Sequence, residues 1–145
     1  KLGLVLLVKD DEQLAHVRAQ ITDYASICES ILANMIAYGI ENGKIIGILY
    51  KFTDIKNKKN PIPWASIKNK TSAATKNGLF WCIEVAYDSK IIDLRMKDQL
   101  HSLRKERNTV HLTNKIKYSF INESKWAYSI LINLAVVTKK WKGKP

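Results

Sequence analysis

The chain has 145 residues, of which 46% are hydrophobic and 26% are charged, and its formal net charge is +11. These values are typical of one soluble globular domain, here residues 1–145, with enough chain to bury a core. The basic excess favours a polyanionic partner (RNA, DNA or an anionic membrane). The apolar run at residues 3–8 is too short to span a bilayer and lacks a signal-peptide cleavage site, so we expect no membrane partner and a cytoplasmic location.

Cys28 and Cys82 are the only cysteines. They are too far apart in the sequence to form a metal-binding CxxC pair, and no other cluster of metal ligands is visible. We expect both thiols to be buried as small hydrophobic groups in a reducing compartment. The sequence therefore predicts no metal and no cofactor.

The first predicted helix covers residues 10–41. Apolar side chains recur along it at steps of three and four residues, from Leu14 to Tyr38, which places them on one face. Asn42 and Gly43 follow, and both residue types favour the left-handed conformation that ends a helix.

A short helix at residues 43–53 and a basic connector at residues 54–77 are predicted next. The connector contains two prolines and six lysines, among them Lys58 and Lys59. Prolines predict an irregular loop. A solvated run of charge is the favoured interpretation of these lysines, and an arm that contacts RNA is the other.

Three more helices are predicted, at residues 79–88, 95–112 and 123–140. We expect Trp126 of the last helix to pack in the core and Trp141 to lie in a frayed tail. Several helices with short connections predict an all-α fold, an antiparallel bundle of four or five helices.

Polar side chains gather on one face of the helix predicted at residues 95–112. Arg104, Arg107, Asn108 and His111 share this face, and His101 lies one turn earlier. An arginine fork matches phosphate oxygens, and an imidazole exchanges protons near neutral pH. Together these groups could clamp a phosphate and remove the 2′-hydroxyl proton of RNA without a metal ion.

A structural interpretation of the same residues is open as well. Arg107 interrupts an apolar stripe of its helix, which is costly unless the arginine is paired or meets a groove or a partner surface. The polar residues could pair with Glu84, Asp88 or Asp93 and fasten helices together. Glu84 and Asp88 lie one turn apart, and a solvated helix face explains this spacing better than an acid/base pair.

The segment LHSLRKERNTVHL, residues 100–112, resembles the signature helix of the HEPN family. The family consists of helical proteins of bacterial defence, toxin–antitoxin and RNA-processing systems. The matching residues are Arg107 and Asn108, followed by His111, with Arg104 one turn earlier. More weakly, the segment YASICESILANMI around Glu29 resembles the family's first helix, in which a glutamate lies among apolar residues.

The spacing within the motif does not decide which of the two arginines is the catalytic one. Six residues separate Arg104 from His111, which fits the family's usual spacing. Three residues separate Arg107 from His111, which is shorter than usual. The resemblance implies a metal-independent ribonuclease whose site forms where two signature helices meet in a homodimer. Some members have lost catalysis and serve as binding or assembly modules.

Two functions are therefore expected from the sequence. The first is a metal-independent endoribonuclease that cleaves RNA by 2′-hydroxyl attack at a composite dimer interface. The alternative is an inactive HEPN-like module that binds RNA or a protein, such as an antitoxin. The catalytic candidates are Arg104, Arg107, Asn108 and His111. The further RNA-binding candidates are Lys105, Lys58, Lys59 and His101.

Overall fold

The computed structural model contains α-helices and no strand within the part of the chain that it describes, which confirms the all-α prediction. The described residues are 10–45, 78–109 and 120–144. The helices in chain order are α2 (Asp10–Glu41), α5 (Gly78–Asp88), α6 (Leu94–Thr109) and α7 (Phe120–Lys142). They match the predicted helices closely. The helix predicted at 43–53 and the connector at 54–77 lie largely or wholly outside the described residues.

Helix α2 forms along the apolar stripe that predicts it. Buried side chains recur at steps of three and four residues and form one wall of the core: Val17, Ile21, Ala25, Cys28, Leu32 and Ile36. The helix ends where Gly43 adopts a positive φ of 70°. A residue with a Cβ is strained in this conformation, so glycine is well suited to the position.

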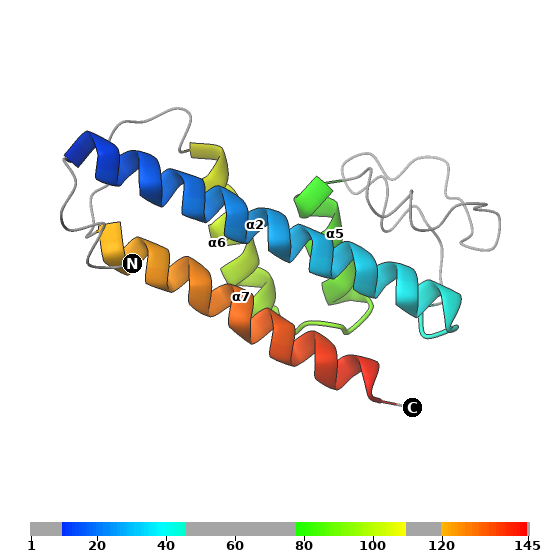
Figure 1. The fold of residues 1–145 in the computed structure, drawn as a ribbon. Coiled ribbons are helices and arrows are strands. Elements are labelled where there is room, and N and C mark those ends of the chain that lie inside the picture. The colour runs from blue at the N-terminus through cyan, green and yellow to red at the C-terminus, as the bar shows by residue number, and fades with distance from the viewer. Residues whose placement is uncertain (1–9, 46–77, 110–119, 145) are drawn as a thin grey trace.

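Helices α2 and α7 lie side by side and run in the same direction (Figure 1). The Oγ atom of Ser124 donates a hydrogen bond to Oε1 of Gln20, at 2.6 Å. One turn further along both helices, the rings of Tyr24 and Tyr128 pack with centroids 5.6 Å apart. The expectation of an antiparallel bundle is therefore wrong for this pair. Helix α6 brings the chain back to the end of the molecule where α2 begins, so α7 starts there too (Figure 1).

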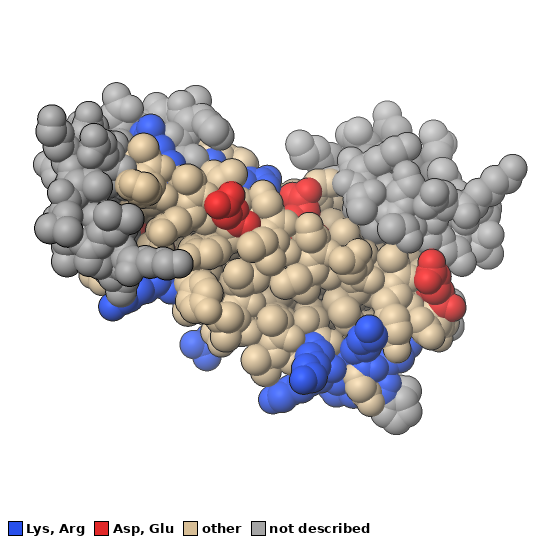
Figure 2. All heavy atoms as spheres, in the orientation of Figure 1, with Lys and Arg blue, Asp and Glu red and all other residues tan. Residues whose placement is uncertain are grey.

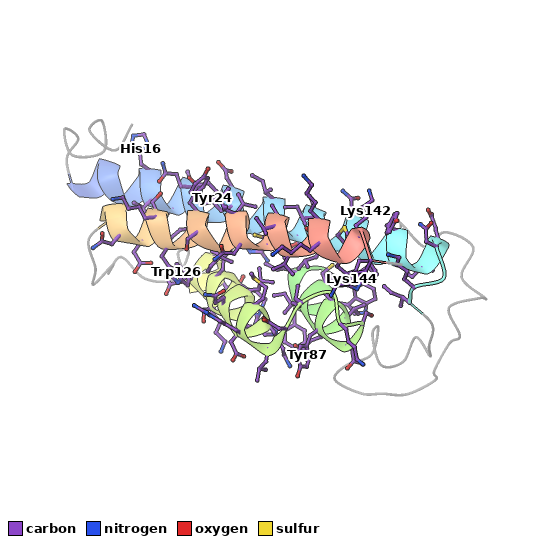
Figure 3. The ribbon with its side chains drawn as sticks, turned by 90° about the horizontal axis from the view of Figure 1, so that it is seen from below. His16, Tyr24, Tyr87, Trp126, Lys142 and Lys144 are labelled. Carbon is purple, nitrogen blue, oxygen red and sulfur yellow. The ribbon has the colours of Figure 1, made fainter. Side chains whose placement is uncertain are left out.

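Helices α5 and α6 form a second layer, on one side of the α2–α7 pair (Figures 1 and 3). The turn between them contains Lys90 with a positive φ of 61°. The backbone N–H of Ile91 donates to the carbonyl of Ala86 at 2.8 Å, which closes the end of α5. This layer contributes a second wall of the core, which includes Leu79, Cys82, Ile83, Val85, Met96, Leu100 and Leu103. Helix α7 adds Ala127, Ile130, Leu131 and Leu134 to the same core.

Trp141 lies in the core rather than in a frayed tail, so that prediction is wrong. Its side chain is 9% exposed. A Cβ atom built on Gly39 would lie 2.9 Å from the indole and 2.7 Å from Ile45. The absence of a side chain at Gly39 therefore makes room for the indole between the ends of α2 and α7. Trp126 is partly buried and packs against the core, as predicted.

Candidate functional site

Helix α6 carries most of the residues that the sequence singles out, and an N-terminal cap fixes where it begins. The carboxylate of Asp93 accepts a hydrogen bond from the backbone N–H of Met96 at 2.8 Å, which caps the start of the helix. Because the start is fixed, Lys97, His101 and Arg104 follow at helical spacing along the side that faces α5.

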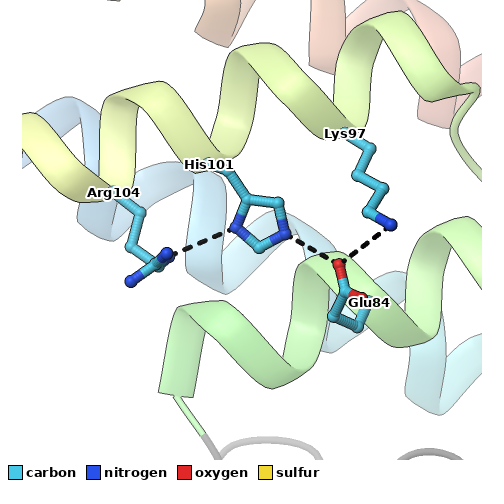
Figure 4. A network of polar contacts seen from close by, with 4 residues as sticks. All are labelled: Glu84, Lys97, His101 and Arg104. Carbon is cyan, nitrogen blue, oxygen red and sulfur yellow. Dashed lines mark hydrogen bonds and ion pairs between the residues drawn. The ribbon is translucent and has the colours of Figure 1, made fainter.

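A chain of polar contacts joins these three side chains to Glu84 of α5 (Figure 4). One carboxylate oxygen of Glu84, Oε2, lies 2.7 Å from Nε2 of His101 and 3.4 Å from Nζ of Lys97. The other imidazole nitrogen, Nδ1, accepts a hydrogen bond from Nε of Arg104 at 3.3 Å. All of these contacts are partly buried, so water screens them less than it screens a surface pair.

Phe80 adds an aromatic wall to this network. Its ring centroid lies 5.2 Å from that of His101, and the guanidinium carbon of Arg104 lies 5.0 Å from the same centroid. An arginine over an aromatic face is attracted by the ring quadrupole. Phe80 is not among the site residues that the sequence predicts. The signal that could have found it is its position one turn before Glu84, since neighbours at that spacing share a helix face.

Arg107 faces α2 rather than α5. Its Nη1 atom lies 3.2 Å from Oε2 of Glu29, and the two side chains are 25% and 32% exposed. The interruption of the apolar stripe is thus compensated within the chain by a carboxylate. A second copy of the protein is not needed to supply an anion for this arginine.

The other predicted site residues divide into two groups. Lys105 and Asn108 are exposed on α6 near the two arginines. His111, Lys58 and Lys59 lie outside the described residues, so their placement relative to the arginines stays a prediction. His101 contacts Glu84, which is one of the carboxylates that the structural interpretation offers as partners. Asp88 is exposed at the end of α5.

The cysteines are poor candidates for nucleophiles. Cys28 and Cys82 are fully buried thiols. Burial raises the pKa of each thiol to about 12, and the nearby charge of Glu29 contributes to the raised pKa of Cys82. A thiol must ionise to attack or to bind a metal, so these groups are inert at neutral pH. Within the described ranges, no three His, Cys, Asp or Glu residues lie close enough to hold a metal ion.

A second basic region lies at the C-terminal end of α7, where Figure 2 shows lysines along one edge of the molecule. The Nζ atom of Lys44 donates to the carbonyls of Trp141, at 3.4 Å, and Lys142, at 3.2 Å, and also to that of Lys144. The Nζ atom of Lys142 lies 4.7 Å from the ring centroid of Tyr38. These contacts cap the carbonyl end of α7, where positive charge is favourable.

No family model matches the chain, and neither does any of the curated proteins or solved structures compared with it. None of the four described helices combines the length and the apolar character that crossing a membrane requires.

Proposed function

We propose that this chain is a HEPN-like protein that cleaves RNA without a metal ion. Its site would consist of Arg104, Arg107, Asn108 and His111. The observation that carries the proposal is the ion pair between Arg107 and Glu29, at 3.2 Å. This pair joins the two segments in which the family resemblance lies, although 78 positions separate the residues in the sequence.

The proposed reaction assigns a separate task to each side chain. His111 takes the proton from a ribose 2′-hydroxyl, and the oxygen attacks the adjacent phosphorus. The bond from phosphorus to the 5′-oxygen breaks, and that oxygen leaves with a proton from a second acid, His111 of another copy of the chain. The products are a 2′,3′-cyclic phosphate and a 5′-hydroxyl. Arg104 and Arg107 stabilise the negative charge that develops on the phosphorane oxygens.

The alternative, a binding module without catalysis, is favoured by a different observation. His101 of α6 is held by Glu84 of α5, and this contact fastens the two helices together. Polar contacts of this kind also hold helices together in proteins with no active site. In such a module, the net charge of +11 would attract RNA and release counterions, so its affinity would fall steeply with salt.

The test is cleavage of 5′-labelled single-stranded RNA by the purified protein, with EDTA present throughout. We expect a ladder of fragments that end in 2′,3′-cyclic phosphate. His111→Ala should lower the rate by about 10²–10⁴-fold, which is the usual contribution of a general acid or base. His16→Ala is the matched control, because His16 is exposed on α2 and should be dispensable.

Three outcomes separate the possibilities. If the wild-type protein does not cut RNA but binds it, the binding module is the correct function. If His111→Ala cuts as fast as the wild type, the assignment of His111 is wrong. If His111→Ala unfolds, as seen by circular dichroism, the histidine belongs to the core and the catalytic assignment fails.

A further inference from the structure

The hydrogen bonds of His101 determine where its proton lies. Nδ1 lies 3.3 Å from Nε of Arg104, and an arginine N–H can only donate. Nδ1 must therefore accept with its lone pair, and it carries no proton. The proton of the neutral ring is then on Nε2, which donates to the carboxylate of Glu84 at 2.7 Å. Lys97 binds the same carboxylate oxygen at 3.4 Å and helps to hold it in place.

Arg104 is fixed by this arrangement on two sides. Its Nε–H donates to His101, and its guanidinium carbon lies over the ring of Phe80, which is 37% exposed. Its two terminal amino groups make no hydrogen bond or ion pair with any residue that the structure describes. Figure 4 shows Arg104 at the end of the contact chain. The two terminal amino groups form a pair of parallel donors, which matches two oxygens of one phosphate group.

We propose that Arg104 is a preformed fork for one phosphate group of RNA, and that Glu84 and His101 are positioning residues that hold the fork ready. The choice of RNA as the ligand rests on the proposed function, whereas the fork itself rests on the contacts of α5 and α6. An arginine that is already ordered loses less rotamer freedom when it binds, and this lowers the cost of binding. Exposed Lys105 and Asn108 lie beside the fork and extend the surface that the neighbouring phosphates of a strand would meet.

When Glu84 is removed, the proposal predicts a change in anion affinity opposite in sign to the change expected from charge alone. Glu84 is negative and lies near the fork, so its removal should strengthen the binding of an anion if only charge matters. If Glu84 positions Arg104 through His101, Glu84→Ala should instead weaken binding, by about three- to tenfold. Asp88→Ala is the matched control, because Asp88 is an exposed carboxylate one turn further along α5. It should leave affinity unchanged or raise it slightly.

A second pair of variants tests the hydrogen bonds directly. In His101→Gln, the amide N–H₂ can donate to Glu84 and the amide oxygen can accept from Arg104, so affinity should be retained. In His101→Leu, the shape is similar but both hydrogen bonds are lost, so affinity should fall as in Glu84→Ala. This pair decides the matter even if Glu84→Ala fails to fold.

The measurement is an NMR titration of the full chain with a 2′-O-methyl oligouridylate, which cannot be cleaved, and with inorganic pyrophosphate. At pH 8 the two-bond ¹H–¹⁵N spectrum should show the Nε2–H tautomer of His101. The Nε–H signal of Arg104 should shift with either ligand. A proton on Nδ1, an unmoved Arg104 signal, or tighter binding by Glu84→Ala would overturn the proposal. If pyrophosphate binds at Arg104 but RNA is neither cut nor bound, the proposed function is wrong. The assignment of Arg104 as a preformed phosphate-binding group then remains valid.

Discussion

The ion pair between Arg107 and Glu29 is a polar contact between α6 and α2. Both side chains are about one-quarter to one-third exposed, so solvent screens the pair. Pairs of this kind contribute roughly 0–1 kcal/mol. We expect Arg107→Ala to lower the unfolding free energy by about 1 kcal/mol or less, as measured by urea denaturation. Arg95→Ala, at an exposed position of α6, is the control and should have no effect.

A double-mutant cycle with Glu29→Ala isolates the pair. The coupling free energy between Arg107 and Glu29 should be stabilising, and it should become smaller at high salt. A coupling of zero would mean that the contact does not stabilise the protein. If stability changes little while RNA cleavage is lost, Arg107 acts on the substrate rather than on the fold, as the proposed function requires.

Glu123 provides a residue-scale prediction about pH. Burial raises its pKa above the ordinary value of 4.5, and the nearby charge of Glu106 raises it further. The folded state therefore holds this proton more tightly than the unfolded state does. The stabilisation is complete below about pH 4.5 and is lost as the pH rises through the raised pKa.

Glu123→Gln removes this titration, so its unfolding free energy should depend less on pH above 4.5 than that of the wild type. The measurement is urea denaturation at a series of pH values, with Glu41→Gln, on the exposed end of α2, as the control. If the unfolding free energies of the wild type and Glu123→Gln change with pH in the same way, the raised pKa of Glu123 is contradicted.

At the scale of elements, Gly39 decides how closely the ends of α2 and α7 approach. Alanine normally stabilises a helix interior relative to glycine by about 1 kcal/mol. Here the new Cβ would lie 2.9 Å from the rigid indole of Trp141, and overpacking of this kind costs about 1–3 kcal/mol. We therefore expect Gly39→Ala to destabilise the protein by about 1 kcal/mol in urea denaturation. In a Trp141→Leu background, the same substitution should cost less or become stabilising.

All four described helices could be predicted from the sequence because their signals are local. The stripe from Val17 to Ile36 and the cap at Asp93 involve neighbours only a few residues apart. The burial of Trp141 and the parallel course of α2 and α7 could not be predicted in this way. They depend on contacts between residues about a hundred positions apart, such as that between Lys44 and Trp141.

In the candidate site too, contacts within one helix could be predicted from the sequence, whereas contacts between helices could not. Arg104 and His101 are on one helix, so their spacing predicts a shared face, and the structure places them in contact. Glu84 was one of three carboxylates that the sequence offered as partners. Nothing in the sequence distinguished it from Asp88, because the choice depends on how α5 is rotated against α6. The proximity of Arg107 and Glu29 likewise depends on how α6 packs against α2.

At the scale of the whole molecule, the surface divides into charged and uncharged regions. The face over α2 and α7 is uncharged across its middle, whereas lysines gather at the end of α7 (Figure 2). Exposed apolar side chains of α2 and α7 are Ile27, Tyr128, Ile132 and Val136. The face carrying Arg104 belongs to the other layer. A homodimer of copies that each carry +11 could thus form through either face.

The proposed reaction requires a dimer in which two α6 helices meet. Two variants, each with one introduced cysteine and tested separately, can identify the interface. Asn108→Cys places a thiol at an exposed position near the end of α6, and Ser129→Cys places one at an exposed position of α7. The native thiols are buried with pKa values of about 12, so a bismaleimide at pH 7 should react with the introduced cysteine only. We expect a cross-linked dimer with Asn108→Cys and little with Ser129→Cys. Because both chains of a two-fold dimer present the same patch, one thiol per chain is sufficient. A cross-link at Ser129→Cys alone would place the interface on α2 and α7 and rule out the composite site.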